Sequence, residues 1–464
     1  MEAQLNIFER LLRWIEESIT IKLMSIGFLV LILLIPSSWI QDLMRERESR
    51  AEGVVTEVSS KWSGAQTLSG PILVVPYKTI QIIKHEKEPN EIVEVTKRYF
   101  FLPETLRVTG KVNPQILHRG IFDVAVYQSE LDVSAKFNTP DFAVLHIADN
   151  MVMWKDAYMI FSINDLRGIS DNPSFTVGGV AKDTEPSNDL GVLVGRPIAV
   201  ANYESPTPVY ATNGIIAKLG WASAADFNGD AQVSLKLKGS QSLNFVPSGK
   251  TTDVSLSGPW ADPSFDGEFL PEHRTINEKG FSADWKVLHY NRPFSQQWTS
   301  ENETLNGSEF GVNLLVPVDQ YQKSIRTSKY GQLIIILTFV ALFMVEITRK
   351  TRIHPFQYIL VGVALIIYYT LLISLSEQVG YNLAYWIATL ATVGLVAFYS
   401  TSFLVTKQLV MLFTSLLVIF YTFIFIIILQ QDFSLLLGSV GLFLIVAALM
   451  YFSRKIERYK TTQA

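Results

Sequence analysis

Long apolar runs that are almost free of charge constrain this chain more than any other feature. Several lie between Gln332 and Phe452, and another, LMSIGFLVLILLIPSSWI, extends from Leu23 to Ile40. A helix needs about 20 predominantly apolar residues to cross the roughly 30 Å hydrocarbon core of a bilayer. The runs therefore predict an integral membrane protein. Residues 23–40 are expected to be an uncleaved transmembrane anchor rather than a signal peptide, because the run is long and no A-x-A-like cleavage site follows it.

The later runs predict a C-terminal bundle of five transmembrane helices at residues 330–453. The first run is short, so we expect its helix to begin near Lys329 and to end near Thr348. The expected spans are Leu333–Val345, Tyr358–Leu375, Leu383–Val405, Leu409–Leu429 and Phe433–Phe452.

The charges of the connecting loops predict the topology, because Lys and Arg are enriched in cytoplasmic loops. The loops at 376–382 and 430–432 contain neither residue type, so we expect them outside. The basic residues expected inside are Arg349, Lys350, Arg352, Lys407, Arg454, Lys455, Arg458 and Lys460. Both termini are then cytoplasmic and residues 41–329 form an extracytoplasmic domain, which is periplasmic if the chain belongs to an inner membrane. The anchor itself is less decisive, because Arg residues flank it on both sides.

Two short segments complete the predicted layout. Residues 1–22 are expected to be a cytoplasmic amphipathic segment, and residues 454–464 a cytoplasmic tail. The first segment fits either a helix on the membrane surface or an extension of the anchor. Its apolar residues at helical spacing are Ile7, Phe8, Leu11, Leu12, Ile15 and Ile19.

Composition narrows the class of partner. Only 18% of the 464 residues are charged, and the net charge is −4. The absence of a basic excess disfavours nucleic acid as a partner, whereas the apolar runs make the lipid bilayer one. The chain has no cysteine, which excludes disulfides, thiol nucleophiles and Cys-ligated metals.

Residues 41–329 have the pattern of antiparallel strands and turns, which predicts a periplasmic β-rich domain that resembles a β-sandwich. Apolar Val233, Leu235 and Leu237 alternate with polar residues, as expected of a strand with one buried face. The expected strands are Ile72–Tyr77, Leu106–Val112, Phe122–Tyr127, Tyr158–Ile163, Val233–Leu237, Val254–Leu256 and Val312–Val316, with Phe122 in the core. Helices are expected at Val209–Phe227 and Asp319–Tyr330.

The motif Phe-Leu-Pro-Glu occurs at Phe101–Glu104 and again at Phe269–Glu272, before a strand-like stretch each time. The repetition fits either a duplicated β-unit or chance, and no regular period supports a solenoid.

The sequence shows no catalytic, cofactor-binding or metal site. It contains no HExxH, GxSxG or P-loop motif, so no catalytic residue, cofactor or metal ligand is assigned. Asp165 and Arg167 fit a structural turn with a solvated ion pair better than a functional turn. The histidines are interpreted as structural, and they are His85, His118, His146, His273, His289 and His354.

Four tryptophans of the outer domain and one glutamate of the membrane spans could each have either a functional or a structural role. Trp221, Trp260, Trp285 and Trp298 fit core or interface aromatics better than platforms for a sugar or an apolar ligand. Glu346, alone among the spans, is expected to pair locally with Arg349 or Lys350 rather than to couple proton transport. Gly438 and Gly441 suit close helix contact, and the sequences at Asn302 and Asn306 match glycosylation acceptors.

The chain resembles the CreD family of bacterial inner-membrane proteins, also described as cell envelope integrity or colicin tolerance proteins. The likeness extends over nearly the whole chain and rests on several long segments in the same order. They are Lys22–Arg47, Ser69–Tyr77 (SGPILVVPY), Tyr99–Gly110 (YFFLPETLRVTG), Arg119–Leu131 (RGIFDVAVYQSEL), Asp165–Ile169 (DLRGI), Phe245–Pro247, Gly280–Trp285 (GFSADW) and Tyr321–Glu346.

The resemblance implies an inner-membrane protein associated with a two-component regulatory system and with tolerance to colicins and β-lactams. It transfers no catalytic residue. We therefore expect a non-enzymatic protein that supports envelope integrity through contacts of its periplasmic domain with another envelope protein or polymer. The alternatives are a transporter or channel for a small or lipidic solute, and a membrane enzyme that acts on envelope material.

Overall fold

The protein is described by a computed structural model that covers residues 19–83, 91–143, 146–188, 190, 192–198, 209–211, 213–299, 303–314, 319–349, 353–404, 406–430 and 433–458. The chain divides into two compact units. The β unit is Gly53–Val316, and the helical unit combines Met1–Glu52 with Pro317–Ala464. Helix α2 (Ile19–Trp62) continues without a break from the helical unit into the β unit.

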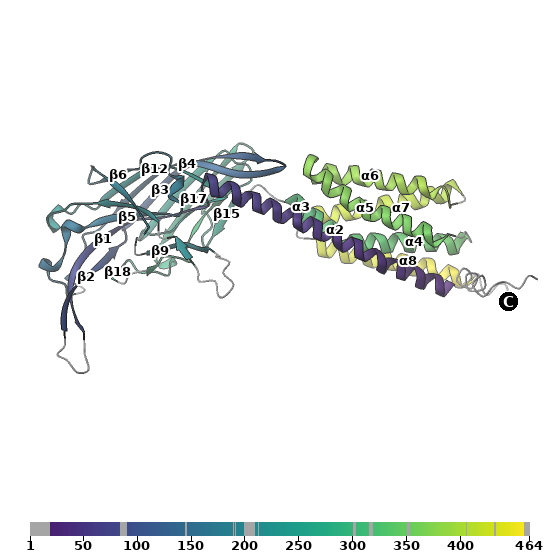
Figure 1. Cartoon of the computed structure of the whole chain (residues 1–464), viewed down its shortest axis with the longest axis horizontal. Coiled ribbons are helices and arrows are strands. Elements are labelled where there is room, and N and C mark those ends of the chain that lie inside the picture. Colours follow the sequence, from purple (N-terminus) through teal and green to yellow (C-terminus); the bar gives the residue numbers. More distant parts are fainter. Residues whose placement is uncertain are drawn as a thin grey trace, which may run out of the picture. The chain divides into compact units, whose positions relative to one another are not determined.

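The β unit is built on two large sheets and one small one (Figure 1). The first sheet has the order β15 (Ser264–Gly267), β20 (Phe310–Asn313), β13 (Ser242–Phe245), β1 (Gln66–Ile83), β5 (Tyr158–Ile163), β11 (Gly214–Lys218) and β8 (Thr184–Ser187). In addition, β2 (Glu91–Phe101) pairs with β1, and β18 (Gln297–Trp298) pairs with β2.

The second large sheet has the order β16 (His273–Asn277), β17 (Gly280–Leu288), β14 (Thr251–Gly258), β3 (Thr105–Arg119), β4 (Phe122–Lys136), β12 (Asp230–Ser240), β6 (Ser174–Val177) and β7 (Val180–Lys182). The small sheet has the order β10 (Val209–Ala211), β9 (Val192–Ile198) and β19 (Glu303–Thr304). Most neighbouring strands run antiparallel, whereas the pairs β1–β13, β3–β14 and β9–β19 run parallel.

One hydrophobic core joins the two large sheets. It contains Leu73 and Phe161 from the first sheet and Val108 and Val133 from the second. In β12, buried and exposed residues alternate, and Val233, Leu235 and Leu237 are all buried as predicted. This alternation places every second side chain between the sheets, because successive side chains of a strand point to opposite faces.

Two sequence-based expectations for the β unit are wrong. Residues 209–227 are not a helix, because they form β10, β11 and the short 3₁₀ turn Ala224–Asp226. Strand β11 pairs with β5 on one side and with β8 on the other, so pairing with distant strands overrides the local pattern. Phe122 is only half-buried, because it lies beside the tip of the β3–β4 hairpin, beyond the part that packs in the core.

The repeated Phe-Leu-Pro-Glu motif has a shared position in the fold. The copy at Phe101–Glu104 connects β2 of the first sheet to β3 of the second. The copy at Phe269–Glu272 connects β15 of the first sheet to β16 of the second. Both copies therefore lie where the chain crosses from one large sheet to the other.

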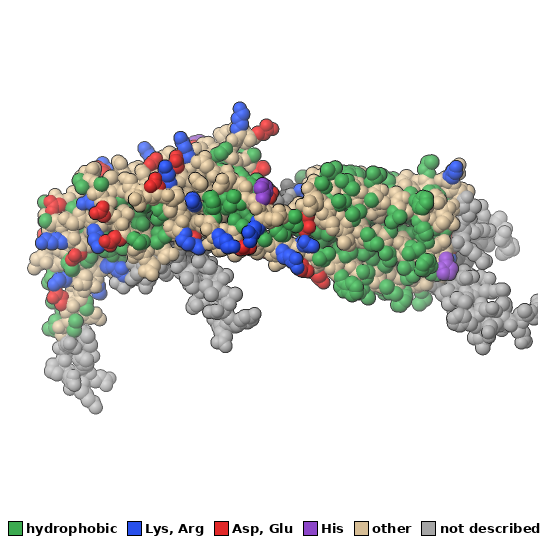
Figure 2. All heavy atoms as spheres, turned by 45° about the horizontal axis from the view of Figure 1, so that its top comes forward, with side chains coloured by type: hydrophobic (Ala, Val, Ile, Leu, Met, Phe, Trp, Pro, Cys, Tyr) green, Lys and Arg blue, Asp and Glu red, His purple; other side chains and the backbone are tan. Residues whose placement is uncertain are grey.

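The helical unit contains α3 (Asp319–Lys329), α4 (Gly331–Arg349), α5 (Pro355–Val379), α6 (Tyr381–Ser400), α7 (Lys407–Leu429) and α8 (Ser434–Arg458), together with the first part of α2. Among the described residues, five segments are long and apolar enough to cross a membrane, and a sixth is a shorter apolar stretch, Leu436–Ala447. The five are Lys22–Trp62, Gln320–Ile347, Pro355–Val379, Tyr381–Ser400 and Lys407–Leu429. Hydrophobic side chains cover much of the visible surface of these helices (Figure 2).

Small residues and caps determine how the helices begin and meet. At the start of α5, the side chain of His354 accepts a hydrogen bond from the backbone N–H of Phe356, and Pro355 occupies the first turn. A Cβ at Gly362 would lie 2.3 Å from Leu33 Cδ1, so this glycine leaves room for the Leu33 side chain of α2 to pack against α5. Gly441 likewise lies against the Phe423 ring, whereas Gly438 has open space around it.

We expect the fragment Gly53–Val316 to fold on its own as a soluble β-rich domain, because its two large sheets enclose a core of their own. Far-UV circular dichroism of the purified fragment should show a strand-dominated spectrum and a cooperative thermal transition. A helix-dominated spectrum would contradict the assignment of an independent β unit.

Candidate functional site

A polar cluster with many hydrogen bonds lies where α2 ends, and we name it the helix–sheet junction. It consists of Ser60, Ser63, Gly64, Gln66, Asp165, Arg167, Gly168, Lys238 and Ser240. These residues come from the end of α2, the start of β1, the 3₁₀ turn Leu166–Gly168 and the end of β12. The junction therefore connects the last turn of α2 to both large sheets.

Gln66 lies at the centre of the helix–sheet junction and is fully buried. Its amide nitrogen donates to Ser63 Oγ at 2.9 Å, to the Asp165 carbonyl at 3.0 Å and to the Lys238 carbonyl at 3.1 Å. Its amide oxygen accepts from the backbone N–H of Asp165 at 3.1 Å. One side chain thus holds three separate segments of the chain together, and both ends of its amide group are satisfied.

The Asp165–Arg167 turn closes the junction from the solvent side. Burial raises the pKa of the Asp165 carboxyl. Hydrogen bonds from the Arg167 side chain and from the backbone N–H groups of Gly64 and Arg167 lower it. The hydrogen bonds have the larger effect, so the pKa is lowered to about 2. Arg167 also donates to the Ser60 carbonyl at 2.7 Å, near the end of α2. Asp165 and Arg167 do form a turn with an ion pair, in which Arg167 is exposed and Asp165 is largely buried.

The tryptophans are part of the packing of the β unit. Trp221 and Trp285 lie in the main core, and Trp298 stacks on Phe100 with ring centroids 5.3 Å apart. Trp260 is half-buried, and its indole N–H donates to the Asp262 carbonyl at 3.1 Å. Trp221, Trp285 and Trp298 are buried, which supports the interpretation as core aromatics.

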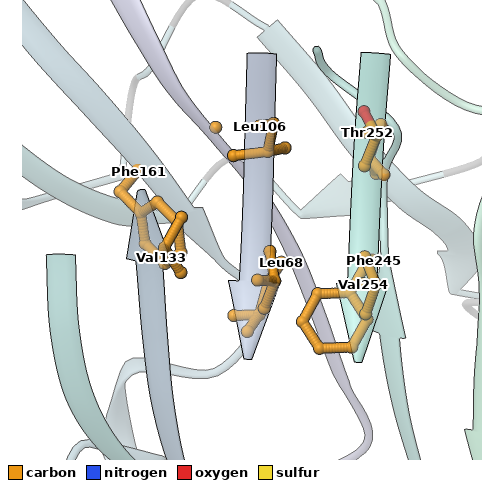
Figure 3. Close-up of a pocket in the computed structure, with 10 residues that line it drawn as sticks. Leu68, Leu106, Val133, Phe161, Phe245, Thr252 and Val254 are labelled. Atoms are coloured by element: carbon orange, nitrogen blue, oxygen red, sulfur yellow. The ribbon is translucent and has the colours of Figure 1, made fainter. Parts of the chain in front are cut away.

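A small cavity between the two large sheets is lined by side chains of both (Figure 3). Its volume is about 10 Å³, which is room for about one water molecule. Most of the residues that line it are apolar, such as Leu68, Leu106 and Phe161. The Thr252 hydroxyl oxygen accepts a hydrogen bond from the backbone N–H of Gly249. This cavity is a gap in the core packing rather than a ligand pocket.

Arg292 is a buried cation that the sequence analysis did not single out. Burial lowers the pKa of its guanidinium to about 10, so it stays protonated at neutral pH. It donates to the Phe294 carbonyl and to Gln296 Oε1, each at 2.5 Å, and Gln296 in turn donates to the Leu102 and Pro103 carbonyls. Arg292 therefore braces the segment before β18 against the crossover from β2 to β3.

The histidines are dispersed over the chain. His118 contacts Asp123 at 2.6 Å, His289 lies against the Tyr290 ring, and His354 caps α5. His146 and His273 lie in other parts of the β unit, and His85 lies outside the described residues. Within the part of the chain that the structure describes, no three His, Asp or Glu side chains are grouped as metal ligands would be.

In the helical unit, Glu346 has a different partner from the one expected. Its carboxylate forms an ion pair with Lys22 of α2, and it accepts hydrogen bonds from the Tyr358 hydroxyl and the Ile353 backbone N–H, both at 3.1 Å. Glu346 is only 6% exposed. This contact fastens the N-terminal helix to α4 and α5, whereas the side chains of Arg349 and Lys350, the expected local partners, lie outside the described residues.

A second ion pair joins α2 to α5 nearer the other end of the spans. Arg47 lies 3.9 Å from Glu377, whose other carboxylate oxygen accepts from the Tyr321 hydroxyl at 3.1 Å. Along a helix, Lys22 and Arg47 are roughly 37 Å apart, which exceeds the hydrocarbon thickness of a bilayer. The two pairs therefore have the spacing expected of contacts near the two membrane surfaces.

Comparison with known proteins identifies relatives along nearly the whole chain. The family described as inner membrane protein CreD matches residues 18–459. The inner membrane protein CreD of Escherichia coli (strain K12) is 31% identical over 445 residues, which cover 94% of this chain and 93% of that protein.

We expect Glu346→Gln to destabilise the full-length protein by about 3 kcal/mol, because Lys22 would keep its charge in a largely buried place without a counter-charge. Adding Lys22→Met should restore most of the loss, since Gln still accepts hydrogen bonds from Ile353 and Tyr358. Thermal unfolding in detergent measures both effects. Arg45→Gln is the control, because its pair with Asp42 is exposed. Equal losses in the single and double variants would show that the charge pair is unimportant.

Proposed function

The chain belongs to the CreD family of inner membrane proteins, and from that premise we propose that it supports cell envelope integrity without catalysing a reaction. In this proposal the β unit is an antiparallel β-sandwich in the periplasm, where it contacts another envelope protein or polymer. The helical unit spans the inner membrane with both termini in the cytoplasm. The result is tolerance to colicins and β-lactams, under the control of a two-component system as the family resemblance implies.

The main support for this proposal is that α2 forms specific polar contacts within each of the two units. In the helical unit, Lys22 pairs with the buried Glu346 and Arg47 pairs with the partly buried Glu377. In the β unit, the helix–sheet junction ties the end of the same helix to β1 and β12. A helix held in this way suits a protein that keeps a periplasmic domain attached to the membrane while other envelope components bind to it.

The structural results also bear on the two alternatives. Coupled transport often uses an intramembrane carboxylate that faces a cavity, whereas Glu346 is engaged by Lys22, Tyr358 and Ile353 near the end of α4. An enzyme needs a cleft with convergent titratable groups, whereas the Asp165 and Arg292 clusters of the β unit bind their own backbone. Both observations favour a binding and anchoring role.

The topology can be tested with single cysteines, because the chain has none of its own. Thr275→Cys in the exposed strand β16 and Gln430→Cys after α7 should react with a membrane-impermeant thiol reagent once the outer membrane is permeabilised. Thr401→Cys after α6 should react only after the inner membrane is opened. Labelling of Thr401→Cys in intact inner membranes would overturn the arrangement.

The role of the junction can be tested by complementing a deletion strain under β-lactam stress. A Cβ at Gly168 would lie 2.3 Å from the Lys238 carbonyl and 2.5 Å from Gln66 Nε2, so Gly168→Ala should break the junction and abolish tolerance. Gly53→Ala is the matched control, because that residue of α2 has open space around it.

Membrane abundance separates loss of function from loss of protein in this experiment. If Gly168→Ala is degraded, Arg167→Gln provides a milder test, since it removes the hydrogen bond to Ser60 without inserting an atom. Tolerance is expected to fall for Arg167→Gln at normal abundance. Wild-type tolerance for both variants would refute the proposed role of the junction.

A further inference from the structure

The two copies of the Phe-Leu-Pro-Glu motif share a backbone geometry as well as a place between the sheets. In the first copy, the Glu104 backbone N–H donates to the Lys136 carbonyl at 2.8 Å, and Lys136 lies opposite the next residue of the chain. In the second copy, the Glu272 backbone N–H donates to the Asp284 carbonyl at 2.8 Å, and Asp284 also lies opposite the next residue. The two crossovers therefore have the same hydrogen bond in the same register.

The first copy is covered by a later part of the same chain, residues 292–298, which we name the covering segment. Its strand β18 pairs with β2, and the Gln296 carbonyl accepts from the Leu102 backbone N–H at 3.0 Å. The Gln296 side chain also donates to two carbonyls of the motif, at 2.9 Å each. Phe294 and Trp298 lie in one apolar cluster with Leu102, which is only 4% exposed. The chain itself therefore buries the leucine of the first copy.

The second copy has no such cover among the described residues. It connects β15 to β16, and these are the end strands of the two large sheets. Leu270, which corresponds to Leu102, is 67% exposed. Within the part of the chain that the structure describes, the backbone N–H of Leu270 and the carbonyls of Leu270 and Pro271 form no hydrogen bond. The leucine that is buried at the first copy is thus open to a partner at the second.

The charges around the second copy indicate which kind of segment it can bind. Residues 261–273 contain no Lys or Arg, and the first cation that follows is Arg274 in β16. The same stretch has four exposed carboxylates, which are Asp262, Asp266, Glu268 and Glu272. A second copy of this chain that paired through β15 would bring these like charges together, which is unfavourable. A segment with basic residues is attracted instead.

We propose that β15 and the second motif copy bind an extended basic segment of another envelope protein, which adds as a strand to the first large sheet. Edge strands accept added strands because their outer N–H and C=O groups have no neighbouring strand. The partner lies on the second copy as the covering segment lies on the first, with an aromatic side chain over Leu270. This inference rests on the proposed function and deepens it, because it names the surface and the class of partner.

Fluorescence anisotropy of a labelled peptide tests this edge, with the full-length protein in detergent. The probe is Arg-Pro-Phe-Ser-Gln-Gln-Trp, the sequence of residues 292–298, and a scrambled peptide is its control. The covering segment is tethered at a high effective concentration, so the free peptide cannot displace it from the first copy. Leu270→Asp should weaken binding about tenfold or more. Val180→Asp is the matched control, because Val180 is 59% exposed in the end strand β7.

Two further results of this measurement decide the proposal. Replacing both Glu268 and Glu272 by Gln should weaken binding at low salt and have little effect at high salt, because salt screens the attraction. Unchanged binding of this double variant at low salt would overturn the basic class of partner. Absence of saturable binding by the wild-type protein, or equal binding of the scrambled peptide, would overturn the edge itself.

Complementation of the deletion strain separates this inference from the proposed function. Leu270→Asp should lower tolerance at normal membrane abundance and leave the melting temperature unchanged, because the side chain is mostly exposed. Val180→Asp should retain wild-type tolerance. Wild-type tolerance for Leu270→Asp would overturn the inference. If Gly168→Ala abolishes tolerance in the same experiment, the proposed function stands without this edge.

Discussion

The side chain of Gln66 forms hydrogen bonds to three separate segments at the point where α2 ends and β1 begins. Strand β1 pairs with β2, β5 and β13, so its position sets the first large sheet. The Lys238 carbonyl, which accepts from Gln66, belongs to β12 of the second large sheet. The fully buried amide group of Gln66 therefore connects the end of α2 to strands of both large sheets.

The same requirement, that a buried polar group have a partner, governs the helical unit. Glu346 and Lys22 adjoin the long apolar stretches of α4 and α2, and each charge would be costly alone. Together with Tyr358 and Ile353, they form a contact that holds α2 on the bundle. The arrangement suits anchoring of α2, because the Glu346 carboxylate already interacts with Lys22, Tyr358 and Ile353.

The sequence by itself determined the features that depend on local pattern. Apolar length predicted α2 and the later spans, and period-two alternation predicted strands such as β12 with its three buried apolar residues. The sequence also carried the family resemblance, which the comparisons confirm. It could not decide contacts between distant residues, because a periodic pattern does not identify a partner.

Only the tertiary structure decided those contacts. It paired Glu346 with Lys22, 324 positions away, and turned residues 209–227 into strands by pairing β11 on both edges. It also left Phe122 half-buried near a hairpin tip and brought tyrosine rings of α5, α6 and α7 together. In each case the energy comes from desolvation and pairing of groups far apart in the chain, which no local window of sequence contains.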